Sequence, residues 1–324
     1  MKPFIPMKGI QVAAITPFKR NPENNPHQPY TIDTSVIEHY SSYLSQNGAS
    51  GVFVGGVTGD FTILTTEERL DLQAAWLQTS IRSKLNHVII HIGGPFFEDV
   101  IKLGVHASEN SASAVAITFP SFPAHAPQTE THLIEYLSRV SFALPDIPLL
   151  IYNISGTTPS HYVNNLYPLL KKAIDGNKVP TLVGLKYSST NFIDAFELKT
   201  YLGLDIAIGC DEQMLAACAM GFTSFIGSTY NIFSKKFNHI LSLMETGNTR
   251  EASELSQRLF TAIRTITSVC YKLTLRKVVN KSLQAKFGVS LGDETKYSFL
   301  TDDDVASSDK LVETFMKDFG DLID

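Results

Sequence analysis

The chain has 324 residues, of which 44% are hydrophobic, and its formal net charge is −5. This size and composition predict one large globular protein with a well-buried core, since α/β barrels often exceed 250 residues. The mild negative charge gives no electrostatic reason to expect nucleic acid or an anionic membrane as a partner, and no apolar run reaches the roughly 18 residues that a membrane span needs.

Short apolar, strand-like runs recur between longer segments of helical period. The predicted strands are residues 10–16, 51–55, 88–92, 114–118, 148–152, 182–186, 205–208 and 224–227. The predicted helices between them include residues 35–46, 66–82, 96–110, 131–142, 191–202 and 212–220. Alternation of this kind predicts parallel strands, because each helix must carry the chain back across the sheet. Eight such units predict the α/β class and a (β/α)8 TIM barrel, although an open doubly wound sheet could be built from the same units.

After residue 227 the pattern contains helices only, at residues 233–245, 251–269, 273–286 and 302–318. The first of these could close the barrel. We therefore expect a catalytic barrel domain at residues 1–246 and additional C-terminal helices at residues 247–324, packed on the barrel. Residues 21–29, rich in proline and asparagine, predict a surface loop.

Lys186 is the most distinctive reactive residue, because it ends the apolar run at residues 182–185. Active sites of (β/α)8 barrels lie at the C-terminal ends of the strands. Burial there disfavours the ammonium form and leaves a neutral amine that can attack a ketone. The alternative is a lysine whose charged end reaches solvent at the barrel rim.

Other strand ends bring polar groups to the same rim. Tyr152 ends the preceding strand, where its phenol could move a proton or simply be a core tyrosine. The loop at residues 55–60 contains three glycines, which would allow its backbone N–H groups to approach an anion. The alternative is an ordinary glycine-rich turn. Asp211 and Glu212 open a helix, where they could bind a polyol or merely cap the helix.

The sequence gives no reason to expect a metal or an organic cofactor. The histidines at positions 87, 91, 106, 125 and 132 have no i, i+4 arrangement on a helix, so structural roles are expected for them. The three cysteines lack the spacing of a zinc site. The N-terminus lacks the long apolar core of a secretory signal, and a cytoplasmic protein with reduced thiols is expected.

With these residues, the chain resembles the N-acetylneuraminate lyase and dihydrodipicolinate synthase superfamily over roughly residues 9–247. The resemblance is carried by the segments 13–18, 51–60, 64–69, 151–154 and 184–186. Within the superfamily the N-acetylneuraminate lyase branch fits best, because Gly209–Gln213 and Gly227–Asn231 look like the segments with which sialate lyases hold the sugar tail. A dihydrodipicolinate synthase should carry an arginine shortly after the Tyr152 strand, where this chain has Ser155–Thr158.

The resemblance implies a class I, Schiff-base pyruvate aldolase that cleaves N-acetylneuraminate to N-acetylmannosamine and pyruvate. Lys186 would form the Schiff base, Tyr152 would take the proton of the C4 hydroxyl, and Thr58 would help to hold the carboxylate. The substrate-binding residues implied by the resemblance are Gly59, Ser188, Gly209, Asp211, Glu212, Gly227 and Ser228. Relatives are usually tetramers, so a homo-oligomer, tetramer or dimer, is expected.

Two alternatives follow from departures in the pattern. Val57 stands where relatives usually have a hydroxyl residue, Asp60 replaces a glutamate, and the segment Ser155–Pro159 differs from the usual one. The same chemistry could therefore act on another 2-keto-3-deoxy sugar acid, as an aldolase or a dehydratase. A non-catalytic protein that binds sialate or pyruvate is the second alternative.

Overall fold

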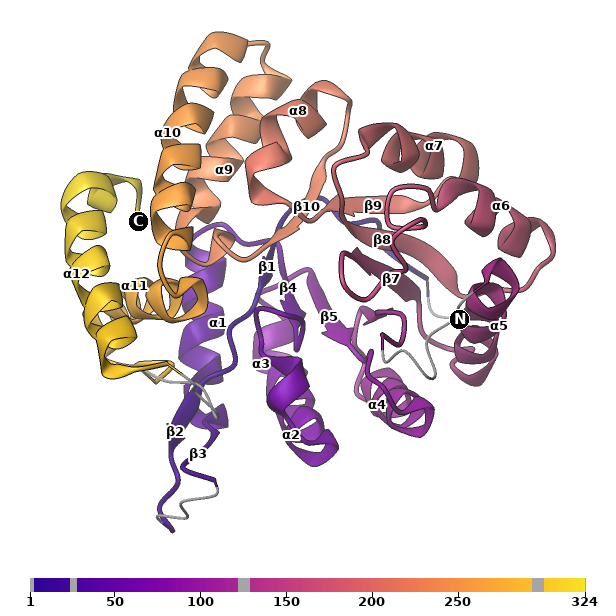
Figure 1. Cartoon of the computed structure of the whole chain (residues 1–324), viewed down its shortest axis with the longest axis horizontal. Helices are drawn as coiled ribbons and strands as arrows, with labels where there is room; N and C mark the ends of the chain where they lie inside the picture. The colour runs from indigo at the N-terminus through magenta and orange to yellow at the C-terminus, as the bar shows by residue number, and fades with distance from the viewer. Residues whose placement is uncertain (1–2, 24–27, 122–128, 293–299, 324) are drawn as a thin grey trace. The chain divides into compact units, whose positions relative to one another are not determined.

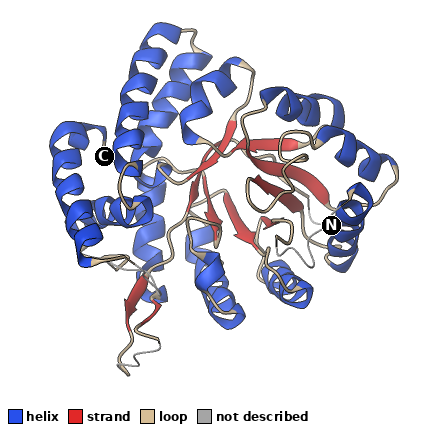
Figure 2. Cartoon of the chain, viewed as in Figure 1, coloured by secondary structure: helices blue, strands red, loops and turns tan. Residues whose placement is uncertain are grey.

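The computed structural model describes residues 3–23, 28–121, 129–292 and 300–323. Within these residues, eight strands close into a barrel in the order β1-β10-β9-β8-β7-β6-β5-β4 (Figure 2). The neighbouring strands pair in parallel, as at β7·β8 and β1·β4. The predicted (β/α)8 barrel is therefore confirmed. The barrel strands are β1 (Gly9–Ala13), β4 (Gly51–Val54), β5 (His87–His91), β6 (Ala114–Ile117), β7 (Leu149–Ile154), β8 (Leu182–Ser188), β9 (Asp205–Ile208) and β10 (Ser224–Gly227).

The chain divides into two compact units. The first contains the residues up to Lys8 together with His87–Ile226, and so includes β5 to β9 and most of β10. Its strands are buried on both faces because helices follow each of them, as expected for parallel sheets. The helical segments of this unit are α4 (Phe97–Glu109), α5 (Glu130–Ala143), α6 (Tyr167–Asp175), α7 (Phe192–Leu202), η3 (Asp211–Gln213) and α8 (Met214–Ala219).

The second unit contains Gly9–Asn86 and the chain from Gly227 onward. It pairs β1 with β4 and includes an antiparallel hairpin of β2 (Phe18–Arg20) and β3 (Tyr30–Ile32). Its long C-terminal helices pack on one another and on α1 (Figure 1). Its helical segments are η1 (Thr34–Val36), α1 (Ile37–Gln46), η2 (Phe61–Ile63), α2 (Thr66–Trp76), α3 (Thr79–Arg82), α9 (Tyr230–Glu245), α10 (Thr249–Thr267), α11 (Tyr271–Phe287), α12 (Asp302–Phe319) and η4 (Gly320–Leu322).

The predicted helix at residues 66–82 is interrupted. It begins with a capping box, in which Thr65 and Glu68 satisfy each other's backbone N–H groups. It stops after Trp76, because Gln78 adopts an extended conformation with ψ of 144°. The side chain of Arg82 then donates to the carbonyl of Leu77 over 2.9 Å, which satisfies a backbone group that the break leaves open.

Two other differences concern short elements. Helix α6 is absent from the predicted helices. Its proline in the first turn is typical of a helix start, and its leucines are buried, as on the packed face of a helix. The predicted surface loop at residues 21–29 lies between the strands of the β2–β3 hairpin, which the sequence pattern does not predict. Residues 24–27 of that loop lie outside the described part of the chain.

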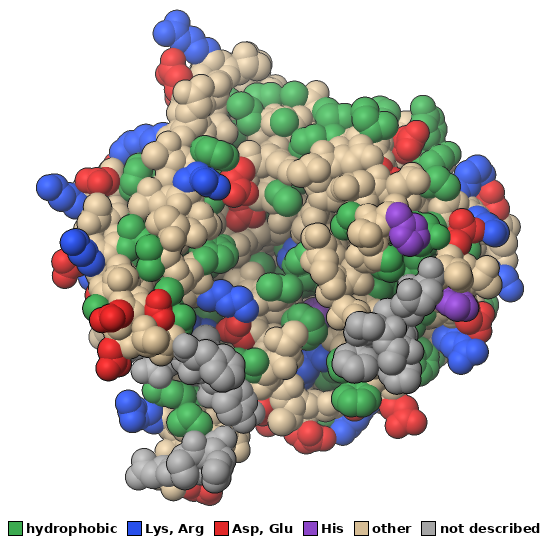
Figure 3. All heavy atoms as spheres, in the orientation of Figure 1, with side chains coloured by type: hydrophobic (Ala, Val, Ile, Leu, Met, Phe, Trp, Pro, Cys, Tyr) green, Lys and Arg blue, Asp and Glu red, His purple; other side chains and the backbone are tan. Residues whose placement is uncertain are grey.

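Helix α7 presents exposed hydrophobic side chains, namely those of Ile193, Phe196 and Tyr201. Figure 3 shows hydrophobic side chains among the polar ones on the visible face of the first unit, to which α7 belongs. Exposed apolar groups that cluster on one helix are typical of surfaces that a partner covers. The expected homo-oligomer stays a prediction. None of the helices in the described residues has the length and hydropathy needed to span a membrane.

Candidate active site

Lys186 and Tyr152 lie side by side inside the first unit. Strand β8 carries the lysine and strand β7 the tyrosine, and the two residues are direct partners in the parallel ladder. The Nζ atom of Lys186 lies 4.2 Å from the centre of the Tyr152 ring. Both side chains are buried, with 4% and 3% of their surfaces exposed. The sequence-based expectation that these two residues share one environment is confirmed.

The local sequence explains why the amine is buried. Residues Gly184 to Tyr187 of β8 are all buried, so the lysine stem lies in a buried part of the strand. Gly184 allows β9 to come close, since a Cβ atom at this position would lie 2.1 Å from the carbonyl oxygen of Asp205. This close strand packing excludes water around the stem of Lys186.

Burial lowers the pKa of Lys186 to about 7, against the opposing effects of the Asp211 carboxylate and of Cys210. A buried ammonium loses its hydration, and the neutral amine is favoured instead. An amine with a pKa near 7 is roughly half neutral at neutral pH, and the neutral form is the nucleophile. The arrangement therefore provides a reactive amine without a metal ion.

Tyr152 is held as a neutral phenol. Burial raises its pKa, and the side chains of Cys210 and Asp211 act in the same direction. A hydrogen bond with the side chain of Ser188 acts in the opposite direction. A phenol in such a site can give up its proton only while it receives another, which suits a proton shuttle between two groups of a bound substrate.

Three further predicted residues belong to the same group. Gly209 follows β9 and lies against Ser188, because a Cβ atom at position 209 would be 2.1 Å from the Ser188 Oγ atom. Asp211 is buried and influences the pKa values of both Lys186 and Tyr152. Its neighbour Glu212 is exposed. The structure thus brings Ser188, Gly209 and Asp211 together with the reactive pair.

His91 is a neighbour that the sequence-based prediction does not place in the site. It ends β5, is buried, and its ring meets the Tyr152 ring edge to face, with centroids 5.8 Å apart. The same signal that singles out Lys186, a polar residue at the end of an apolar strand, also marks this histidine. The structural role expected for His91 from its lack of helical metal-ligand spacing stays a prediction, and His125 lies outside the described residues.

Thr58 and Gly59 belong to the second unit, in the turn that follows β4. The N–H of Gly59 donates to the carbonyl of Gly56 over 3.0 Å, and that of Asp60 to Val57 over 3.2 Å. Among the described residues, the N–H groups of Val57 and Thr58 have no such acceptor. These two amides are therefore among those in the turn that remain open to an anion.

Gly227 and Ser228 also belong to the second unit, at the end of β10. The hydroxyl of Ser228 forms a short hydrogen bond with the hydroxyl of Tyr271, the first residue of α11. Tyr271 comes from the C-terminal helices, which the sequence pattern does not connect with any strand end. No group of His, Cys, Asp and Glu residues suited to a metal ion occurs within the described residues.

Comparisons with known proteins agree with this arrangement. The chain matches the Dihydrodipicolinate synthetase family over residues 6–290. It is 33% identical to the N-acetylneuraminate lyase of Xenopus tropicalis over 251 residues, which cover 77% of each chain. It is 31% identical to the N-acetylneuraminate lyase of Homo sapiens over 290 residues, 88% of this chain and 80% of the human one.

A solved structure of Proteus mirabilis N-acetylneuraminate lyase has the same fold. It superposes with a TM-score of 0.81 and covers 96% of this chain and 99% of its own, at 22% identity. At this level of identity the likeness concerns the barrel and its helices only.

Proposed function

Because the chain belongs to the Dihydrodipicolinate synthetase family, we propose that it is a class I carbon–carbon lyase that cleaves N-acetylneuraminate to N-acetylmannosamine and pyruvate. The observation that carries this proposal is the buried Lys186 amine, with a pKa of about 7, placed 4.2 Å from the Tyr152 ring. The relatives named above are N-acetylneuraminate lyases, and their name supports the choice of substrate.

The reaction begins with attack of the neutral Lys186 amine on the C2 carbonyl of the open-chain sugar acid. Loss of water gives a protonated imine, which withdraws electrons from the C3–C4 bond. When the C4 hydroxyl loses its proton, this bond breaks and its electron pair passes to the imine, forming an enamine. N-acetylmannosamine leaves, the enamine takes a proton at C3, and water hydrolyses the imine to pyruvate and the free amine.

Tyr152 moves the proton from the C4 hydroxyl. Its raised pKa means that the resting group is a neutral phenol, so it must release its own proton as it takes the new one. The carboxylate of the substrate is the group that can take the released proton. The hydrogen bond from Ser188 stabilises the phenolate character that develops at the midpoint.

Substrate-binding roles are assigned to further polar residues. Asp211 and Glu212, with Ser188 and Gly209, bind the hydroxyl-rich tail of the sugar. Gly227 and Ser228 are assigned to the same tail from the sequence resemblance. Thr58 binds the carboxylate through its hydroxyl and its open N–H group, and Gly59 supplies the close turn. The predicted cytoplasmic location and homo-oligomeric state accompany this function as predictions.

Reduction with borohydride tests the Schiff base. The protein incubated with pyruvate and borohydride should gain one reduced pyruvate adduct, located at Lys186 by peptide mass spectrometry. The variant Lys186→Met should gain none. The control is Lys171→Met, since Lys171 is exposed and paired with Asp175 over 2.6 Å. An unlabelled wild-type protein would favour the non-catalytic sialate- or pyruvate-binding alternative.

Turnover of two substrates separates the remaining alternatives. N-acetylneuraminate and 2-keto-3-deoxygluconate share the 2-keto acid end and differ in the tail that Asp211 and Glu212 would bind. We expect preference for N-acetylneuraminate by kcat/KM. Val57 lies in the turn that is proposed to bind the substrate carboxylate, and it is 37% exposed. This exposed valine, in place of a hydroxyl residue, is the observation that favours another sugar acid. A strong preference for 2-keto-3-deoxygluconate would remove N-acetylneuraminate as the substrate and leave the Schiff-base chemistry.

A further inference from the structure

Asp60 ends the turn that carries Thr58, and its backbone adopts a conformation that aspartate rarely takes. Its φ of 57° and ψ of 34° place it in the left-handed region, immediately before η2. Such a conformation persists when surrounding contacts hold it, and it is common where a loop is shaped for binding. The contacts that hold Asp60 are therefore of interest for the function of the turn.

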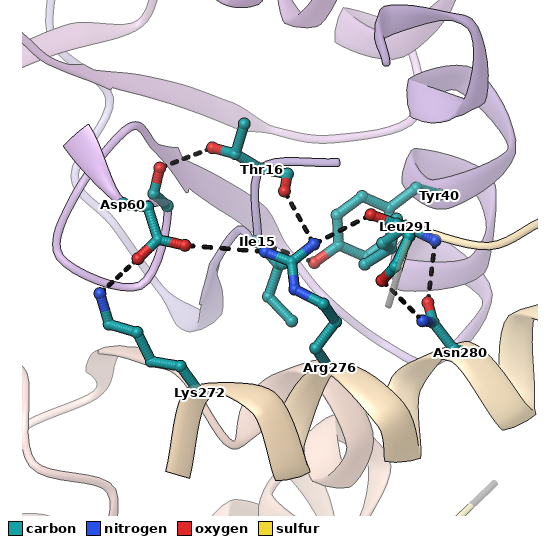
Figure 4. A network of polar contacts seen from close by, with 10 residues as sticks. Ile15, Thr16, Tyr40, Asp60, Lys272, Arg276, Asn280 and Leu291 are labelled. Carbon is teal, nitrogen blue, oxygen red and sulfur yellow. Dashed lines mark hydrogen bonds and ion pairs between the residues drawn. The ribbon is translucent and has the colours of Figure 1, made fainter. Parts of the chain in front are cut away.

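Two cations from helix α11 hold the Asp60 carboxylate. The Nζ atom of Lys272 lies 2.5 Å from one carboxylate oxygen, and the Nη2 atom of Arg276 lies 3.6 Å from the other (Figure 4). Lys272 and Arg276 are four residues apart, so they lie one above the other on the same face of α11. The Asp60 side chain is 7% exposed and that of Lys272 is 46% exposed, so the ion pair joins a buried carboxylate to a partly exposed ammonium group.

Arg276 also connects to the turn by a second route. Its Nη1 atom donates to the carbonyl of Thr16 over 3.0 Å and to that of Leu291 over 2.9 Å. The hydroxyl of Thr16 in turn donates to the carbonyl of Gly59 over 2.6 Å (Figure 4). Helix α11 thus fixes the turn at two successive residues, at Asp60 through the side chain and at Gly59 through the backbone.

These contacts determine where the open amides of the turn point. The N–H groups of Val57 and Thr58 lie within three residues of the two fixed points. We propose that Lys272 and Asp60 are positioning residues, through which helix α11 holds the turn in the conformation that binds the carboxylate of the 2-keto acid. This proposal rests on the proposed function, because it takes the role of the turn from there.

Arg276 and Lys272 differ in burial, and therefore in how their loss would affect folding. Arg276 is 2% exposed and donates to two backbone carbonyls, so its loss would disturb folding. Lys272 is 46% exposed, and its removal leaves no cavity. Lys272 is therefore the residue at which positioning can be tested without unfolding the protein.

Lys272→Met should raise KM for pyruvate about fivefold, the size expected when one partner of a partly exposed ion pair is lost. The measurement is the condensation of pyruvate with N-acetylmannosamine, in which kcat should stay within about twofold because the reacting groups are untouched. Lys272→Arg should restore KM, since it can again pair with Asp60. Lys277→Met is the control, because Lys277 lies on the same helix and pairs with Asp309 over 2.6 Å. The Lys277 side chain is more buried than that of Lys272, at 12% against 46% exposed, so this control is the more demanding one for stability.

A second comparison isolates the carboxylate. Acetone has the keto group of pyruvate and lacks its carboxylate. Borohydride trapping of acetone on Lys186 should proceed at the same rate in wild-type protein and Lys272→Met. Trapping of subsaturating pyruvate should be slower in the variant. A change in the general stability of the protein would alter the trapping rates of acetone and pyruvate equally.

The outcomes separate the two proposals. If wild-type protein traps neither ketone, the Schiff-base function fails and the positioning role falls with it. If wild-type protein traps pyruvate and Lys272→Met has the wild-type KM, only the positioning role is overturned. The positioning role is also overturned if Lys277→Met raises KM as much as Lys272→Met does. It is overturned as well if Lys272→Met slows the trapping of acetone as much as that of pyruvate. Asp60→Asn combined with Lys272→Met should be no worse than Asp60→Asn alone, because Asp60→Asn already removes the ion pair with Lys272.

Discussion

The amine of Lys186 lies over the face of the Tyr152 ring, 4.2 Å from its centre, on the neighbouring strand. A ring face attracts an ammonium group by about 0.5–2 kcal/mol, which would raise the pKa of the lysine. Burial nevertheless lowers that pKa to about 7. Removal from water is therefore the larger effect, and the ring acts mainly as an apolar wall that keeps the amine neutral.

The rate of imine formation should depend on pH through this group. Because only the neutral amine attacks, borohydride trapping with pyruvate should rise with pH to an apparent pKa of about 7 and then level off. Asp211→Asn should move the rising part of the profile to lower pH, since the Asp211 charge raises the pKa of Lys186. Pyruvate has no sugar tail, so loss of tail binding does not affect this measurement.

Glu212→Gln is the control for that shift. Glu212 is the next residue, is exposed, and is not among the groups that affect the pKa of Lys186. Its profile should coincide with that of the wild-type protein. An Asp211→Asn profile that coincides with the wild-type one would mean that the carboxylate does not act on the amine.

The buried lysine should also destabilise the folded protein near neutral pH. Its pKa is lower in the folded chain than in the unfolded chain, so unfolding takes up a proton between pH 7 and about 10.5. The penalty is complete below pH 7, decreases as the pH rises through this window, and disappears above it. Lys186→Met, which keeps a similar shape, removes this penalty.

The free energy of unfolding should therefore be higher in Lys186→Met by about 4 kcal/mol at pH 7 and by about half of that at pH 9. Urea unfolding at the two pH values measures this difference. A gain that is the same at both pH values would point to better packing of methionine rather than to the ionisation of the lysine.

Much of the reactive site could be predicted because it follows from strand periodicity. Lys186 and Tyr152 each stand at the end of an apolar run, and parallel strands place such ends together. The strand ends themselves differ from the prediction. Strands β7 and β8 continue for two more residues, to Ile154 and Ser188, because the ladder between them continues there. The extensions contain polar residues, such as Asn153 and Ser188, so the apolar run that predicts each strand ends before them.

The contacts of Asp60 and the place of His91 could not be predicted in the same way. Lys272 and Asp60 are 212 residues apart in the sequence, and no periodic pattern links a strand-end turn with a C-terminal helix. His91 lies two strands away from Tyr152 in the barrel order, so its ring contact does not follow from the pairing of neighbouring strands. Both relationships are tertiary, and periodicity contains no information about them.

Gly209 should be intolerant of a side chain. A Cβ atom there would lie 2.1 Å from the Ser188 Oγ atom, so Gly209→Ala must displace the hydroxyl that bonds to Tyr152. We expect a loss of about 1–3 kcal/mol in the free energy of unfolding, as for other overpacked sites, together with lower kcat. Thermal unfolding and steady-state kinetics measure the two effects.

Adding Ser188→Ala to Gly209→Ala should recover most of the stability, because it removes the clashing oxygen, while kcat stays low. Gly320→Ala is the control, since a Cβ atom at Gly320 meets nothing within 4 Å and its φ of −59° suits alanine. If Gly209→Ala is as stable as Gly320→Ala, strand β9 is free to move away from Ser188.

Tyr152→Phe should separate formation of the imine from cleavage of the carbon–carbon bond. The phenylalanine ring can keep its places over the Lys186 amine and against the His91 ring, so the pKa of the lysine should change little. Borohydride trapping with pyruvate should then proceed at nearly the wild-type rate. Cleavage of N-acetylneuraminate should slow by about 10²–10⁴-fold, because the group that moves the C4 proton is gone.

Tyr136→Phe provides the matched control for this variant. Tyr136 is a half-buried residue of α5 whose hydroxyl, among the described residues, has no hydrogen-bond partner. Its removal should leave both trapping and cleavage unchanged. Cleavage by Tyr152→Phe at more than about a tenth of the wild-type rate would assign the proton transfer to another group, since a lost acid–base group costs more than this. His91, whose ring contacts Tyr152, would be the first residue to substitute next.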